Sequence, residues 1–259
     1  YAYTAVTSAG IIWRHDPIHA QDDRLRLALE RGTRRQVAAL VPDRETANRR
    51  LLNGELPVNV AVRADNTDAI AALLDRGVDV GQSTVVDALR SLRSLRVLLA
   101  RGADVNAADG TGKTALMKVA EAGAEEFVDL APLLIERGAN VNAADQWGNT
   151  ALMMAAGGGR ESHVDIVRLL LRHRADANAL DNTSSTALMD AARGGTEAHV
   201  ETVKLLLKHG ADRALRDMHG KNAYDYISRD VSKELQDELA RLLGGSAALT
   251  RTPVQKLDE

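Results

Sequence analysis

The chain has 259 residues, a formal net charge of −3, 45% apolar residues and no cysteine. The balanced charge argues against a strongly basic nucleic-acid binder, and the missing cysteine excludes disulfides, thiolate metal sites and a cysteine nucleophile. No apolar run reaches the roughly 18 residues that span a bilayer, so we expect no membrane span. The composition fits a soluble protein of the cytoplasm or of a bacterial periplasm, and the length predicts two globular domains or one elongated array.

Residues 1–21 contain no periodic pattern, and we expect them to form a non-repeat N-terminal arm. Within this arm, His15 and His19 are four residues apart, but Pro17 between them argues against a regular helix there. Apolar residues then recur at helical spacing over residues 22–101, interrupted by glycines. This second segment therefore predicts degenerate helix pairs.

Residues 102–243 contain a repeat with a period of 36 residues. The tetrapeptide Thr-Ala-Leu-Met begins at Thr114, Thr150 and Thr186, and a degenerate copy begins at Asn222. A leucine run and a Gly-Ala-Asp-like marker keep the same step. Each unit predicts a tight turn, a helix opened by the threonine, a second helix and an extended arm. Such a unit cannot bury its apolar face alone and must stack on its neighbours.

These units resemble the ankyrin repeat family. The matching residues in one unit are Asp145, Gly148 and Thr150 of the turn, then Ala151-Leu152-Met153, Ala155-Ala156 and the run from His163 to Leu171. The resemblance implies an all-α solenoid of stacked helix-turn-helix units with β-hairpin-like turns, about seven units over residues 22–243. The three residues beyond the usual period of about 33 fall between the two helices. After the array, residues 244–259 begin with Gly-Gly-Ser, and we expect a flexible C-terminal tail.

Features that look like chemical sites have simpler structural interpretations. Residues 107–114 fit a relaxed phosphate-binding loop, but the other units contain the same turn without that signature, so we interpret the segment as a repeat turn. His163 and His199 occupy one template position, which favours a structural role over metal binding. Neither a nucleophile elbow nor a His-Glu-x-x-His motif occurs in the sequence. We therefore expect no enzyme activity, no metal and no cofactor.

The resemblance to ankyrin repeats implies that the turn tips and the exposed side of each first helix bind a partner. Trp147 is the clearest hot-spot candidate, because it is a tryptophan at a turn tip. Ser184 replaces the turn glycine of the other units, which predicts either a distorted turn or left-handed backbone geometry on a serine. The candidate set is Thr111, Lys113, Lys118, Gln146, Trp147, Asn149, Met154, Thr183, Ser185, Asp190, Arg193, Met218, His219 and Lys221.

This pattern favours a non-enzymatic protein–protein interaction module, and we expect a monomer with another protein as its partner. The mixed charges of the candidate set favour a protein over a polyanion. One alternative is a regulatory or substrate-recruiting region of a larger enzyme or multidomain protein. Another is a nucleic-acid or anionic-surface binder that uses two groups of arginines. They are Arg24, Arg26, Arg31, Arg34, Arg35, Arg49 and Arg50, then Arg90, Arg93, Arg96 and Arg101.

Overall fold

A computed structural model describes residues 5–7, 10–12, 17–80, 84–125 and 129–244. The chain divides into two compact units, Tyr1–Ala107 and Ala108–Glu259. The described residues are mostly helical, with one short antiparallel strand pair, β1 (Ala5–Thr7) and β2 (Gly10–Ile12). His15 of the expected arm and the expected flexible tail beyond Gly244 lie outside the described residues.

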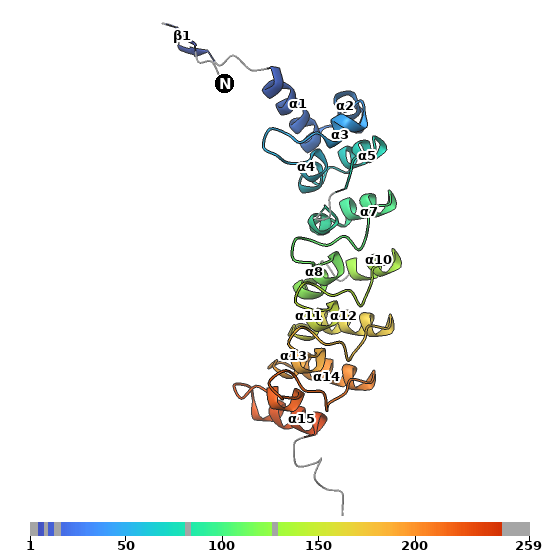
Figure 1. Cartoon of the computed structure of the whole chain (residues 1–259), viewed down its shortest axis with the longest axis vertical. Helices are drawn as coiled ribbons and strands as arrows, with labels where there is room; N and C mark the ends of the chain where they lie inside the picture. Colours follow the sequence, from blue (N-terminus) through green and yellow to red (C-terminus); the bar gives the residue numbers. More distant parts are fainter. Residues whose placement is uncertain (1–4, 8–9, 13–16, 81–83, 126–128, 245–259) are drawn as a thin grey trace, which may run out of the picture. The chain divides into compact units, whose positions relative to one another are not determined.

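The first unit is a series of short helices (Figure 1). They are α1 (Pro17–Arg31), α2 (Arg34–Leu40), α3 (Arg44–Asn48), α4 (Pro57–Arg63), α5 (Thr67–Asp75), α6 (Thr84–Asp87), the 3-10 helix η1 (Ala88–Arg90) and α7 (Leu92–Ala100). Helix α1 begins at Pro17, so the helical part of the chain starts inside the segment expected as an N-terminal arm. Proline suits a first helical position, because the N–H that it lacks has no intrahelical partner there.

The second unit contains the regular repeats, and Figure 1 shows their helices in two rows. Its helices are α8 (Ala115–Ala122), α10 (Leu130–Glu136), α11 (Ala151–Ala156), α12 (Glu161–Arg172), α13 (Ala187–Ala192), α14 (Glu197–Lys208), the 3-10 helix η2 (Ala223–Tyr226) and α15 (Lys233–Leu243). The first helices α8, α11 and α13 pack on one another in chain order, and η2 follows. The second helices α12 and α14 pack together, and α15 covers α14.

Threonine caps fix where the first helices begin. The hydroxyls of Thr114, Thr150 and Thr186 accept hydrogen bonds from the amides three residues later, at 3.4, 3.4 and 3.3 Å. Each cap satisfies one amide that lacks an intrahelical partner. Small residues follow, and alanines such as Ala155 and Ala191 are fully buried. Because alanine has only a methyl group, neighbouring first helices can pack closely.

His163 and His199 have the structural role expected from their matching positions. Their Nε2 atoms lie 3.4 and 3.3 Å from the backbone carbonyls of Glu121 and Gly157, which belong to the preceding repeat. Both rings are buried against glycines, and a Cβ atom at Gly158 would overlap the ring of His163. The histidines therefore connect consecutive repeats.

Candidate functional site

Four turns of one kind form an edge of the second unit, which we call the hairpin edge. It comprises residues 109–113, 145–149, 181–185 and 217–221. In each turn the N–H of the first residue, an aspartate, donates to the carbonyl four residues later, at 2.9 to 3.0 Å. The aspartate Oδ1 accepts the amides two and four residues ahead, at 2.7 to 3.1 Å. The phosphate-loop-like segment 107–114 contains the first of these turns, so its interpretation as a repeat turn is confirmed.

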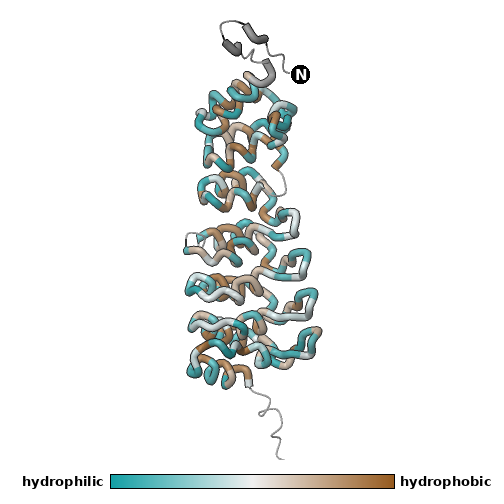
Figure 2. The backbone as a smooth tube through the Cα atoms, turned by 90° about the vertical axis from the view of Figure 1, so that its left-hand side faces the viewer, coloured by the Kyte–Doolittle hydropathy of each residue, from teal (hydrophilic) through white to brown (hydrophobic). Residues whose placement is uncertain are grey.

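Backbone hydrogen bonds connect each turn tip to the next. The amides of Gln146, Asn182 and Met218 donate to the carbonyls of the preceding tips, at 3.1, 2.9 and 3.0 Å. Gly148 lies where the tips approach closely, because a Cβ atom there would be 2.8 Å from the amide nitrogen of Asn182. Figure 2 shows these turns projecting from the helices, mostly in hydrophilic or neutral colours. The hairpin edge is therefore an ordered surface with fixed spacing between its tips.

Ser184 adopts the left-handed geometry that its position predicts. Its φ of 62° matches the positive φ of the glycines at the same place in the other turns, 81° at Gly112, 83° at Gly148 and 74° at Gly220. The third turn keeps the hydrogen bonds of the others, with Ser184 N–H donating to the carbonyl of Asp181 at 2.9 Å. Of the two expectations for this turn, the left-handed serine is therefore correct and the distorted turn is not.

Large apolar side chains are exposed on and beside the hairpin edge. Trp147 is 48% exposed and Met218 is 64% exposed, both at turn tips. Leu180, immediately before the third turn, is 50% exposed and was not among the sequence candidates. Exposed tip positions are also occupied by Gln146, Thr183 and His219. Large exposed apolar groups on a rigid support are typical of binding surfaces.

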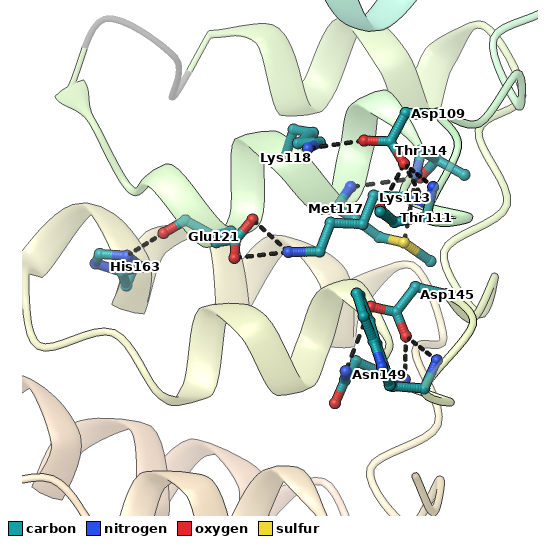
Figure 3. Close-up of polar contacts among 11 residues, drawn as sticks. Asp109, Thr111, Lys113, Thr114, Met117, Lys118, Glu121, Asp145, Asn149 and His163 are labelled. Atoms are coloured by element: carbon teal, nitrogen blue, oxygen red, sulfur yellow. Dashed lines mark hydrogen bonds and ion pairs between the residues drawn. The ribbon is translucent and has the colours of Figure 1, made fainter. Parts of the chain in front are cut away.

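Two candidate lysines form ion pairs within their own repeat, as Figure 3 shows. Lys113 Nζ lies 2.7 Å from Glu121 Oε1, and Lys118 Nζ lies 2.8 Å from Asp109 Oδ2. Partial burial raises the pKa of Asp109, but hydrogen bonds from Lys118 and Thr111 hold it well below its usual range. Both lysine charges are thus neutralised inside the repeat, a pairing that turn templates alone do not predict.

A groove of about 390 Å³ lies beside these ion pairs and brings four of the sequence candidates together. Its lining residues are Lys113, Glu121, Asn149, Met153, Met154, Gly157, Gly158 and Asp190. Burial raises the pKa of Asp190 to about 6, although the nearby Arg193 opposes that shift. The groove therefore combines methionine side chains with a carboxyl group whose pKa is about 6.

Arg193 and Lys221 converge on Tyr226, a residue outside the candidate set. The guanidinium carbon of Arg193 is 4.1 Å from the ring centroid, and Lys221 Nζ is 5.4 Å from it. The tyrosine hydroxyl donates a hydrogen bond to the Asp217 carboxylate, and this bond lowers the pKa of Asp217. Tyr226 occupies the helix position of Lys118, Met154 and Asp190 in the other units, so the 36-residue period is the signal that identifies it.

Ser185 differs from the other candidates because it is only 3% exposed. Its hydroxyl lies 3.8 Å from the sulfur of Met189, and its amide donates to Asp181. Residue 185 lies directly before the helix cap Thr186. The equivalent residues of the other turns are Lys113, Asn149 and Lys221, and the smaller serine packs inward. We therefore remove Ser185 from the candidate surface.

Several arginines of the alternative anionic-surface hypothesis are neutralised by neighbouring acids. Arg26, Arg34, Arg49 and Arg101 form ion pairs with Glu30, Asp75, Asp22 and Asp75, respectively. Within the described residues, no group of three or more histidine, aspartate or glutamate side chains could hold a metal ion. In the same part of the chain, no helix is long and apolar enough to cross a membrane.

A family model described as ankyrin repeats, in three copies, matches residues 85–162 and 124–217. Together these matches cover about half of the chain and include the first three turns of the hairpin edge. No curated protein matches the sequence.

Proposed function

This chain belongs to the ankyrin repeat family, and from that premise we propose that it binds a protein partner through its hairpin edge and the adjoining groove. Ankyrin repeats generally act as protein–protein interaction modules. We further propose that seven helix pairs form the array, degenerate up to residue 101 and regular from residue 102 to residue 243. In this proposal the chain acts as a monomer and has no catalytic role.

One observation carries the proposal: Trp147 and Met218 are exposed at turn tips whose backbones are hydrogen-bonded to neighbouring tips. A large apolar side chain on a fixed backbone loses little conformational entropy when a partner covers it. Tryptophan is also common among the few interface residues that dominate binding energy. The ion pairs of Lys113 and Lys118 make them unsuitable as free cations, so we assign the main affinity to apolar contacts.

Affinity capture from an extract of the source cells tests this proposal. The full chain is compared with a Trp147→Ala/Met218→Ala variant and with Leu52→Ala, an exposed leucine of the first unit that serves as the control. We expect a defined protein to be retained by the wild type and by Leu52→Ala but lost with the double variant. Equal capture of every retained protein by all three chains would contradict the proposed surface.

A further inference from the structure

The groove beside the hairpin edge lies where one repeat position has no side chain in the second regular unit. The repeat position of Glu121 in the first regular unit and of Arg193 in the third is Gly157 in the second. Gly157 has helical backbone angles, φ −75° and ψ −6°. A Cβ atom there would meet its nearest neighbours at 3.8 to 4.0 Å, one of them Asp190 Cβ. The position therefore has space and backbone geometry for a side chain that the chain itself does not supply.

The groove is lined by two methionines and by charged groups that are acidic on balance. Met153 and Met154 provide thioether and methylene surface, which suits the aliphatic part of a long side chain. The charged lining groups are the carboxylates of Glu121 and Asp190 and the ammonium of Lys113. Since Lys113 contacts both carboxylate oxygens of Glu121, at 2.7 and 2.8 Å, this pair is internally balanced. The remaining charge in the groove is that of Asp190.

The negative charge of Asp190 is only weakly stabilised by its surroundings. Its side chain is 22% exposed, and in the described part of the chain its ion pair is with Arg193, at 3.2 Å from Oδ1. Arg193 is shared, because its guanidinium also lies over the ring of Tyr226. A partly buried carboxylate with one long ion pair retains much of its desolvation cost. A second cation in the groove would offset that cost.

We infer that the groove receives an arginine side chain of the protein partner, with its aliphatic stem on Met154 and its guanidinium paired with Asp190. This inference rests on the proposed function and specifies the chemistry of the partner. A guanidinium suits the site better than an ammonium because its planar N–H groups can bind a carboxylate with two parallel hydrogen bonds. The volume is near the lower end of ligand pockets, which span about 300–1,000 Å³, so it accepts one long side chain.

Ionisation of Asp190 should control this contact. The charged or titratable groups around it are Arg193 on its own helix, Asp181 before that helix, Glu121 and Lys113 across the groove, His199 on α14, and Lys221 and Tyr226 around η2. Since burial raises the pKa of Asp190 to about 6, the carboxyl is mostly protonated at pH 5 and ionised at pH 7.5. A cationic guest therefore binds more weakly at pH 5, by about tenfold.

Peptide selection on the full chain provides the probe. Random twelve-residue peptides displayed on phage are selected on the wild-type chain, and the enriched sequences are synthesised. Affinities are then measured by calorimetry at pH 7.5 and pH 5 for the wild type, Asp190→Asn, Gly157→Arg and Trp147→Ala. Asp165→Asn is the matched control, because Asp165 forms the same kind of ion pair three residues from Arg168 but lies on α12, outside the groove.

We expect selected peptides to share an arginine whose replacement by the neutral isostere citrulline weakens binding at least tenfold. Asp190→Asn should cause a similar loss, remove the pH dependence and make the citrulline peptide no weaker than the arginine peptide. Gly157→Arg should block the groove with its own guanidinium and weaken binding at least tenfold, while Asp165→Asn leaves the affinity within twofold. Circular dichroism melts establish that every variant is folded.

Other outcomes would overturn the inference. These are a selection without binders, binders without arginine, binders that prefer lysine, or binders that are insensitive to Asp190→Asn. Trp147→Ala separates this inference from the proposed function. Loss of peptide binding with Trp147→Ala but not with Asp190→Asn would leave the hairpin edge as the binding surface and remove the groove from it.

Discussion

Two histidines at one repeat position, His163 and His199, differ in the hydrogen bonding of Nδ1. The hydroxyl of Thr196 lies 2.7 Å from Nδ1 of His199. The equivalent residue before His163 is Arg160, whose guanidinium instead donates to the carbonyl of Ala122 at 3.3 Å. Among the residues that the structure describes, the Nδ1 atom of His163 is buried without a hydrogen-bond partner, and burial lowers the pKa of this histidine. An unmade buried hydrogen bond of this kind costs stability.

We predict that Arg160→Thr stabilises the protein by about 1 kcal/mol, because a threonine hydroxyl at this position can reach His163 as Thr196 reaches His199. Urea unfolding followed by circular dichroism measures the change in the free energy of unfolding. Arg160→Ala is the control, since it removes the guanidinium without adding a hydroxyl. If the threonine variant is no more stable than the alanine variant, the unpaired nitrogen is not the cause of any difference.

Backbone features that depend on local residue types are predictable from the sequence. The partners of long side chains are not. The capping role of Thr150 and the left-handed backbone of Ser184 follow from local rules for helix starts and turns. The ion pair of Lys113 with Glu121 joins a residue of the first hairpin to a residue of helix α8. The local sequence rules for hairpins do not predict such a pair. Ser185 is buried for the same kind of reason, since its hydroxyl lies against the sulfur of Met189 in the following helix.

At the scale of elements, glycines at one turn position differ in what surrounds them. Gly148 and Gly220 both have positive φ, 83° and 74°. A Cβ atom at Gly148 would be 2.8 Å from the amide nitrogen of Asn182, whereas a Cβ atom at Gly220 would have no described atom within 4 Å. The second turn therefore needs glycine for its contact with the next tip as well as for its backbone conformation.

The two glycines give a matched pair of substitutions. Gly220→Ala should cost about 1 kcal/mol in unfolding free energy, because alanine is strained at positive φ. Gly148→Ala should cost roughly 2–4 kcal/mol, because it adds an overlap with the backbone of the third turn. Chemical unfolding of both variants under the same conditions makes the comparison. Equal destabilisation would mean that the contact between tips contributes little to the hairpin edge.

The helices and turns of the second unit are predictable because a 36-residue period gives each element repeated support. Helix α12, the second helix that the sequence predicts in its unit, spans Glu161–Arg172. The groove is not predictable in the same way. It arises where Gly157 leaves a gap beside Asp190, and these two residues come from neighbouring repeats. The exposure of Leu180 likewise depends on which neighbours fail to cover it.

At the scale of the whole molecule, the chain divides into two compact units. The first unit ends at Ala107, and the change from degenerate to regular repeats at residue 102 stays a prediction from the sequence. Exposed large apolar side chains occur in both units, including Leu27 and Leu52 in the first and Trp147 and Met218 in the second. Those of the second unit lie on turn tips linked by backbone hydrogen bonds, and this rigidity is the basis of the proposed function.

The affinity of the captured partner for surface variants tests that proposal most directly. Calorimetric titration compares the wild-type chain, the Trp147→Ala/Met218→Ala variant and the Leu52→Ala control. Removal of two anchors, each worth at least about 1.4 kcal/mol, should weaken binding about a hundredfold or more, while Leu52→Ala stays within twofold. Because both tip residues are exposed, the free energy of unfolding should change by less than about 0.5 kcal/mol. A folded double variant that binds the partner within twofold of the wild type would contradict the role of the hairpin edge.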